Sequence, residues 1–229
     1  MGVMKTADLR AKLTRILTSI QDLDIGFVDV HLWNGDSLEK ISDQIPPDTF
    51  HTIFEQLRCY QDFFTRLKKA NLNPDSDFRE LLKVANKSFG FTVDFAKIPK
   101  SVPKNCTLHA YSPSGFCLFF TPNFVHQVGY DLLTLVTVPW FELFTRQHNQ
   151  DLDLFMTATQ EFLTQGRQEP VDITAVPENI LFLEKKLGRP EVLSRGYFFS
   201  PVFDQNNSFM ATLVASVHES SKLKETKSA

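Results

Sequence analysis

Apolar residues recur at helical spacing throughout the first part of the chain. Residues 6–23 carry a stripe of leucine and isoleucine between lysine and arginine positions, which is typical of an amphipathic helix. A second helix is predicted to begin at Pro46-Pro47-Asp48, and a third to begin at Asn73-Pro74-Asp75 and to end at Gly90. Residues 1–97 are therefore predicted to form a helical N-terminal region.

The spacing changes after residues 98–105, IPKSVPKN, a polar segment with two prolines that is predicted to be a linker. Beyond it, four β-prone runs are predicted as strands: Thr107–Tyr111, Phe116–Phe120, Val192–Phe203 and Ser208–Val217. The sequences SPSG and DQNN favour tight turns within the first and the last pair of strands. A longer helix is predicted over residues 149–165, where Gly166 ends it.

Composition shows that the chain can bury a large core. Its 229 residues include 22 phenylalanines, whose rings either fill a core or line a cavity. No apolar run reaches the ~18 residues that cross a membrane. Three cysteines without paired spacing, and a start that lacks the features of a signal peptide, predict reduced thiols and an intracellular location, cytoplasmic or nuclear. The net charge of −3 argues against direct nucleic-acid binding over the whole chain.

Catalytic and metal-binding motifs are missing from the sequence. It contains no GxSxG elbow, P-loop, HExxH or dinucleotide fingerprint, so a non-enzymatic protein is expected. Cys106, His109 and Cys117 fall on the predicted first hairpin, and a metal site there is conceivable. Structural zinc takes four closed ligands at tighter paired spacing, so no metal site is predicted.

Four short motifs follow one another after the linker: SPSG, FCLFFTPNF, GYDLLTL and PWFELF. Together with the closing segment GYFFSPVFDQNNSFMATLVASVHE, they resemble the PAS family of sensor and interaction domains over about Asn105 to Ser220. The resemblance implies an α+β fold in which short helices cover one face of a five-stranded antiparallel sheet. It places a PAS-like domain at residues 106–220, expected to fold without the helical region, and a polar tail at residues 221–229.

The resemblance also explains the short segments between the strands. Gly129 would permit the turn that ends one short helix, and Pro139 would start another, with Trp140 and Phe141 packing inward. Where one strand is expected, the chain is longer than the family pattern. Residues 171–175 are interpreted as the strand and residues 177–188 as an inserted helical turn. The Asn-Cys-Arg-Phe-Leu-like signature of flavin photosensors is absent, so cysteinyl-flavin photochemistry is not expected.

The phenylalanine-rich core predicts either closed packing or an apolar ligand pocket. Closed packing is favoured because protein interiors are close-packed, and a pocket also needs convergent polar groups. The candidate pocket residues are aromatic apart from one amide: Phe120, Asn123, Phe124, Tyr130, Trp140, Phe141, Phe155, Tyr197 and Phe199. The candidate ligands are haem, a flavin or an apolar molecule, and a closed core without a cofactor is the other possibility.

The apolar stripe of the first helix is the predicted association surface. In PAS proteins a flanking helix often packs across the sheet and mediates dimerisation. The candidate interface residues are Leu9, Leu13, Ile16, Leu17 and Ile20. The expected function is a PAS-type regulatory or signalling module, as found among transcription regulators, that acts by protein–protein interaction as a homo- or heterodimer and is tuned by a ligand. The alternative is a small-molecule sensor that binds haem, a flavin or an apolar ligand.

Overall fold

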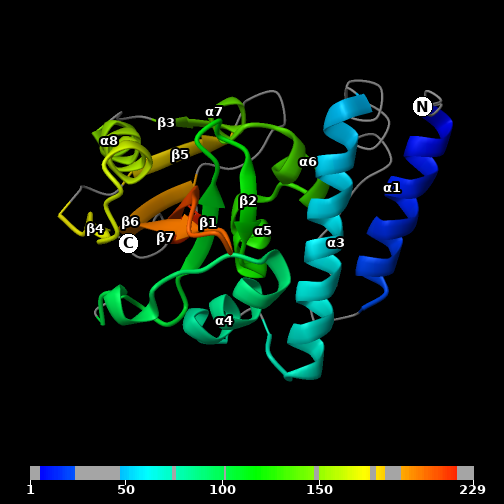
Figure 1. Cartoon of the computed structure of the whole chain (residues 1–229), viewed down its shortest axis with the longest axis horizontal. Helices are drawn as coiled ribbons and strands as arrows, with labels where there is room; N and C mark the ends of the chain where they lie inside the picture. The colour runs from blue at the N-terminus through cyan, green and yellow to red at the C-terminus, as the bar shows by residue number, and fades with distance from the viewer. Residues whose placement is uncertain are drawn as a thin grey trace, which may run out of the picture.

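The elements of the fold are helices that precede and flank an antiparallel sheet (Figure 1). The structure, a computed structural model, describes residues 6–23, 47–73, 76–100, 102–146, 150–175, 179–183 and 192–220. The helices before the sheet are α1 (Thr6–Gln21), α3 (Pro47–Lys69), α4 (Phe78–Phe89) and the 3₁₀ turn η1 (Phe95–Lys97). The helices among the strands are α5 (Pro122–Val128), α6 (Leu132–Thr137), α7 (Trp140–Leu143) and α8 (Gln150–Thr164). The strands are β1 (Thr107–Tyr111), β2 (Cys117–Phe120), β3 (Phe144–Arg146), β4 (Val171–Asp172), β5 (Asn179–Leu183), β6 (Val192–Phe203) and β7 (Phe209–Ser220).

The described strands form one sheet in the order β2-β1-β7-β6-β5-β3, with β4 also paired to β6. Every strand pair in it is antiparallel. Strands β2, β1, β7, β6 and β5 make up the expected five-stranded sheet, and β3 and β4 are short additions of 3 and 2 residues. The predicted α+β fold class is confirmed.

Strands β4 and β5 lie one after the other along the same edge of β6. Val171 of β4 lies opposite Phe199, and Asn179 of β5 lies opposite Ser194, so both follow β6 in the antiparallel sense. The strand expected over residues 171–175 is observed only as β4, Val171–Asp172, and β5 is a further strand along the same edge.

The prediction of a helical turn over residues 177–188 is wrong for Asn179–Leu183, which is strand β5. Four consecutive apolar residues, ILFL, fit a helix or a strand equally well by their spacing. Pairing with β6 on one side and β3 on the other selects the strand. Residues 176–178 and 184–191 lie outside the described ranges.

Helix ends fall where the sequence supplies capping residues. Helix α4 begins later than predicted, at Phe78, because the Asp77 carboxylate accepts a hydrogen bond from the Arg79 N–H at 3.0 Å. Gly90 ends α4 with φ of 66°, and Gly129 ends α5 with φ of 71°. Both are left-handed conformations that favour glycine, so the predicted ends of these helices are confirmed.

Helices cover both faces of the sheet. The face beneath α5, α6, α7 and α8 is called the inner face. On the opposite, outer face, the ring of Phe119 lies 5.5 Å from that of Phe63 of α3 and 5.3 Å from that of Phe89 of α4, measured between ring centroids. Helix α1 packs on the far side of α3 from the sheet (Figure 1). Buried side chains from the helices and the sheet form one continuous hydrophobic cluster that extends from Leu13 to Ala215.

Helix α3 covers the free edge of β2. Gln56 Nε2 donates a hydrogen bond to the Cys117 carbonyl oxygen at 2.5 Å, and the Phe120 N–H donates to the Tyr60 hydroxyl oxygen at 3.0 Å. Gln56 and Tyr60 are one helical turn apart, so a single face of α3 takes the place of a neighbouring strand. An uncovered edge strand is a template for pairing with other chains, and α3 closes this one.

Backbone hydrogen bonds also join the helical region to the sheet. Thr92 and Phe203 exchange two of them, at 2.8 and 3.1 Å. The Phe78 N–H donates to the Lys104 carbonyl oxygen at 3.0 Å, and Arg79 Nη2 donates to the Pro99 carbonyl oxygen at 3.2 Å. Pro99 and Lys104 of the predicted linker are thus held against the start of α4.

Candidate functional site on the inner face

A group of polar side chains lies buried on the inner face, in the neighbouring strands β1 and β7. The register places Thr107 opposite Ser216. Alternate residues of a strand share a face, so His109 lies on the same face as Thr107, and His218 on the same face as Ser216. The exposed fractions are 0% for Thr107, 5% for His109, 2% for Ser216 and 7% for His218. Protein atoms therefore almost completely enclose these four side chains.

The Ser216 hydroxyl is the centre of this group. Its oxygen lies 2.9 Å from His109 Nε2, 2.8 Å from His218 Nε2 and 3.2 Å from Thr107 Oγ1. A hydroxyl has one hydrogen to donate, so at least one of the two imidazole Nε2 atoms must carry a proton and donate to Ser216. The proton positions on the two rings are therefore linked through one serine. His109, Ser216 and His218 are called the His-Ser-His cluster below.

Phe124 of α5 covers the cluster. Its ring stacks on the His109 ring with centroids 4.6 Å apart, and its centroid lies 5.4 Å from that of His218. Phe124 itself is 1% exposed. A serine beside a histidine also resembles a nucleophile with its base, but a substrate cannot reach Ser216 beneath this ring. The arrangement is suited to hydrogen bonding within the core.

Most of the predicted pocket residues meet on this face. Phe120 lies 6.0 Å from Phe124, and farther along the sheet Phe155 of α8 lies 5.8 Å from Trp140 and 5.5 Å from Phe199, between centroids. Tyr111 connects the two groups, because its centroid is 5.1 Å from that of His109 and 6.0 Å from that of Trp140. The described rings form a continuous line of contacts over the sheet.

Three other predicted pocket residues have different surroundings. Tyr130 is buried and its hydroxyl donates to the Leu143 carbonyl oxygen at 2.8 Å. Tyr197 is half-buried in β6. Phe141 is 57% exposed, so the prediction that it packs inward is wrong. Neighbouring residues of a helix point about 100° apart, and in α7 Trp140 and Leu143 are buried while Phe141 points outward.

Two amide side chains of α5 have buried oxygens that form no hydrogen bond. Asn123 Oδ1 and Gln127 Oε1 both lack a partner, and Asn123 is 8% exposed. The two residues are one helical turn apart and flank Phe124, so they lie on one side of the helix. A buried oxygen without a donor costs about 1–3 kcal/mol, which a donor from a ligand or a partner would recover.

The buried thiols are unsuited to nucleophilic chemistry. Burial raises the pKa of Cys106 to about 12, and complete burial raises that of Cys117 as well. The Cys117 thiol donates to the Phe119 carbonyl oxygen at 3.3 Å. Thiolates are the reactive and metal-binding form, and these cysteines stay protonated. Within the described ranges, no three His, Cys, Asp or Glu side chains are grouped closely enough to hold a metal ion.

The candidate interface residues of α1 face α3 in the same chain. Leu13 and Leu17 are 0% exposed, Ile20 is 2% exposed and Ile16 is 6% exposed. The side chain of Leu9 lies outside the description. An interface between chains through this stripe stays a prediction, and it would require α1 to leave α3.

Sequence reasoning missed Ser216, His218 and Gln127. The signal for the first two is the alternation in β7, where Thr212, Ser216 and His218 are spaced by even numbers and the other residues from Phe209 to Val217 are apolar. Such polar residues on the core face need partners, which an alternation count detects. No sequence signal indicates that Gln127 Oε1 is buried without a donor.

Among known proteins, the chain is similar only to solved structures. No family model matches the chain, and no curated protein matches it. The light-state dimer of the fungal blue-light photoreceptor Vivid is 13% identical over 52% of this chain and 84% of that one, with a TM-score of 0.35. An RNA-binding light-oxygen-voltage receptor is 10% identical over 96% of this chain and 65% of that one, with a TM-score of 0.34. At such scores neither likeness carries an argument about the fold or the function of this chain.

Among the helices that the structure describes, none combines the length and the apolar character needed to span a bilayer.

Proposed function

We propose that the chain is a non-enzymatic regulatory module of the PAS type that acts by interaction with a second copy or with another protein. The docking of α5 is the observation that supports this function. This helix of 7 residues rests on the sheet through Phe124, which stacks on a histidine of the His-Ser-His cluster. The cluster has more than one way to place its protons, because Ser216 can donate to either ring.

Regulation follows from the coupling between this cluster and α5. A ligand or partner that favours one hydrogen-bond arrangement changes the orientation of His109 and thereby its contact with Phe124. Helix α5 then shifts between a docked and a released population. The surface around α5 changes with it, and that surface is where a partner would sense the state of the core.

Ser216→Ala tests this coupling directly. Both histidines lose their shared partner inside the core, and the free energy that holds α5 in place falls. We expect the amide hydrogens of α5 to exchange about tenfold faster, which corresponds to one lost hydrogen bond. We also expect the distribution of oligomers in sedimentation velocity to change.

The matched control is Ser208→Ala, which removes a hydroxyl from the exposed turn of the same hairpin. It should leave both the α5 exchange rates and the sedimentation profile unchanged. Equal exchange in α5 for Ser216→Ala and Ser208→Ala, together with equal sedimentation, contradicts the proposed coupling.

A small-molecule sensor is the second candidate function, with haem, a flavin or an apolar molecule as its ligand. It is favoured by Asn123 Oδ1 and Gln127 Oε1, two buried acceptors beside the aromatic line. A ligand with N–H or O–H donors and an apolar body would satisfy both oxygens, and binding sites are typically apolar with a few such polar groups.

Native mass spectrometry and visible absorbance of protein purified from cells separate the two functions. Bound mass or colour that Asn123→Leu with Gln127→Leu abolishes supports the sensor. Unmodified mass in a defined dimer or complex supports the interaction module. A colourless, ligand-free protein that stays monomeric at all concentrations and that no partner retains contradicts both.

A further inference from the structure

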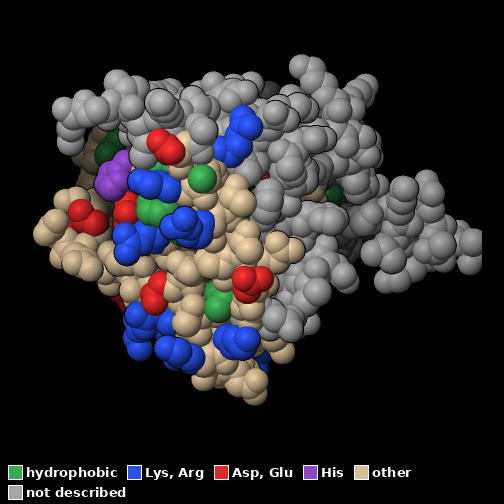
Figure 2. All heavy atoms as spheres, turned by 90° about the vertical axis from the view of Figure 1, so that its right-hand side faces the viewer, with side chains coloured by type: hydrophobic (Ala, Val, Ile, Leu, Met, Phe, Trp, Pro, Cys, Tyr) green, Lys and Arg blue, Asp and Glu red, His purple; other side chains and the backbone are tan. Residues whose placement is uncertain are grey.

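A groove of about 400 Å³ runs between α1 and α3 on the outside of the molecule. This volume is within the range of small-molecule sites. The groove is lined by Lys12, Arg15, Ile16, Ser19, Phe54, Arg58 and Gln61. Figure 2 shows Lys and Arg side chains gathered around hydrophobic ones on this side of the protein. No part of the His-Ser-His cluster lines the groove, so binding there can be tested separately from the coupling proposed above.

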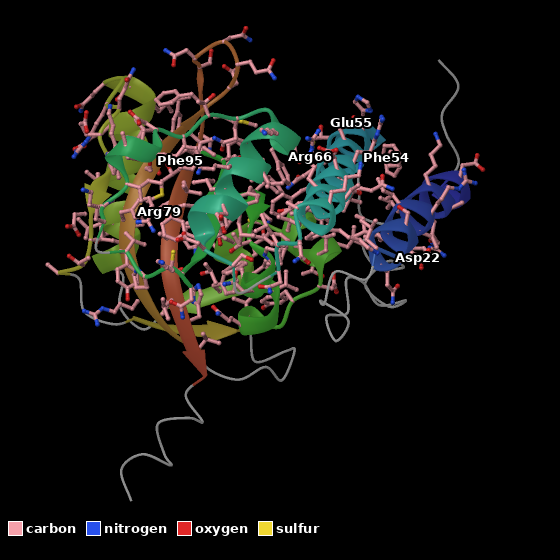
Figure 3. All side chains as sticks on the ribbon, turned by 90° about the horizontal axis from the view of Figure 1, so that it is seen from below. Asp22, Phe54, Glu55, Arg66, Arg79 and Phe95 are labelled. Atoms are coloured by element: carbon pink, nitrogen blue, oxygen red, sulfur yellow. The ribbon has the colours of Figure 1, made fainter. Side chains whose placement is uncertain are left out.

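The spacing of the two helices produces the groove. On α1 the lining residues recur at helical intervals from Lys12 to Ser19, and on α3 from Phe54 to Gln61. Phe54 and Arg58 are each two positions from Gln56, which is about 200° around the helix. The groove therefore lies on the side of α3 opposite to the covered edge of β2. Figure 3 labels Phe54 on the side of α3 that faces α1.

The groove is positively charged although the chain is not. It is lined by three cationic side chains and by no acidic one, while the whole chain has a net charge of −3. Arg58 lies 3.3 Å from Glu55, but this pair is on the surface, with side chains 60% and 46% exposed. Exposed pairs contribute little free energy, so Arg58 is able to exchange Glu55 for an anion in the groove. Arg15 and Arg58, from different helices, carry the charge argument.

The floor of the groove is apolar. Ile16 is 6% exposed, and half-buried Phe54 stacks on Phe50 with centroids 6.0 Å apart and planes 19° apart. At the end of the groove, Gln61 Nε2 donates to the Ser19 hydroxyl at 2.8 Å, which joins the two helices. The groove thus combines a fixed apolar surface with guanidinium groups at its sides. Guanidinium forms strong, directed hydrogen bonds to carboxylate and phosphate.

We propose that this groove binds a free, single-chain anionic amphiphile, a molecule with a phosphate or carboxylate headgroup on an apolar chain. Arg15 and Arg58 bind the headgroup, and the chain lies on Ile16 and Phe54. An inorganic anion leaves the apolar floor uncovered, and an uncharged chain leaves the cations without an anion. Both halves of the groove are needed for the affinity of the intact ligand.

Octyl phosphate, used below its micelle-forming concentration, is the probe, and isothermal titration calorimetry with the full chain is the measurement. Octyl phosphate should bind at least about tenfold more tightly than either octanol or inorganic phosphate, because each of these lacks one half of the ligand. Its affinity should fall as salt is added, because the headgroup contacts are partly exposed. Amide chemical shifts in α1 and α3 should move on binding.

Arg15→Gln with Arg58→Gln keeps good helix formers at both positions and removes the two charges. Octyl phosphate affinity should fall about tenfold, the effect of two partly exposed ion pairs of roughly equal strength. Phe54→Gln should weaken octyl phosphate but leave inorganic phosphate unaffected. The matched control is Arg66→Gln, which removes an arginine of α3 that pairs with Asp62 outside the groove and should bind like the unsubstituted chain.

Circular dichroism and the midpoint of thermal unfolding establish that each variant is folded. Octanol binding as tight as octyl phosphate overturns the proposal, as does an affinity of the Arg15/Arg58 variant within twofold of the unsubstituted chain. Binding to phosphatidylserine vesicles without binding of free octyl phosphate also overturns it, because the groove would then recognise a membrane surface.

Discussion

Trp140 and Phe141 are neighbours in the sequence but lie in opposite environments. Trp140 is 6% exposed, and its ring contacts Tyr111 and Phe155 on the inner face. Phe141 is 57% exposed and its ring lies over Gly115, where a Cβ atom would be 2.6 Å from Phe141 Cε1. Both residues are large and aromatic, so the sequence predicts that both are buried. The residue at which α7 begins determines which of the two side chains faces the core.

Alanine substitution should separate these two residues. Trp140→Ala removes a buried ring and should lower the free energy of unfolding by about 3–5 kcal/mol. Phe141→Ala removes an exposed ring and should lower it by less than about 1 kcal/mol. Urea denaturation measures both values. Equal losses for the two variants would show that α7 does not bury Trp140 and expose Phe141.

The sequence largely predicts which residues lie on the inner face. It does not predict which residues they contact there. Alternation in a strand indicates which side chains share a face, and it places Phe120 and Phe199 in the core. The meeting of His109 with Ser216 and His218 requires the register between β1 and β7, which are separated by about a hundred residues. Register depends on packing and turns, so it cannot be predicted from the sequence of either strand alone.

Among the elements, α3 has a second role, covering the edge of β2, that its sequence does not indicate. Its apolar stripe predicts a helix that packs on a core, but the two hydrogen bonds to β2 come from Gln56 and Tyr60. Burial raises the pKa of Tyr60 far above its ordinary value, so its oxygen stays a neutral hydroxyl and accepts from the Phe120 N–H. This contact closes the edge of the sheet.

Tyr60→Phe tests the edge contact. The substitution keeps the ring but leaves the Phe120 N–H buried without an acceptor, which should cost about 1–3 kcal/mol of unfolding free energy. Hydrogen exchange at the Phe120 amide should become faster. The measurements are urea denaturation and amide exchange.

Tyr197→Phe is the matched control, because Tyr197 is half-buried in β6 and the described residues show no hydrogen bond to its hydroxyl. Its effect should stay within about 0.5 kcal/mol. If Tyr60→Phe is as mild as Tyr197→Phe and the Phe120 amide stays protected, α3 does not serve as an edge cover.

Strands β4 and β5 show the limit of element prediction from one sequence. The turn-rich stretch between Val171 and Ser194 contains short apolar runs whose spacing does not distinguish a helix from a strand. Asn179–Leu183 forms a strand because it pairs with the edge of β6 on one side and with β3 on the other. Both come from distant parts of the chain, so tertiary pairing selects the strand where the local pattern leaves both possibilities open.

On the scale of the whole molecule, the helical region and the sheet share one core. The sequence indicates a boundary at residues 98–105 from two prolines and low hydrophobicity. In the structure, Phe119 on the outer face is 0% exposed because Phe63 and Phe89 cover it. A local break in sequence pattern therefore does not by itself mark a division in packing.

A chain of residues 105–220 alone, expected from the family resemblance to fold by itself, loses this cover. It exposes Phe119 and the edge of β2 together, a combination of apolar surface and unpaired backbone that promotes association. We expect it to elute as large aggregates or to unfold without a cooperative transition. A chain of residues 47–220 retains α3 and α4 and should unfold cooperatively in urea. Size-exclusion chromatography with light scattering provides the second measurement. If residues 105–220 are monomeric and unfold cooperatively within about 1 kcal/mol of the longer chain, the sheet is an independent domain and α3 and α4 are accessories to it.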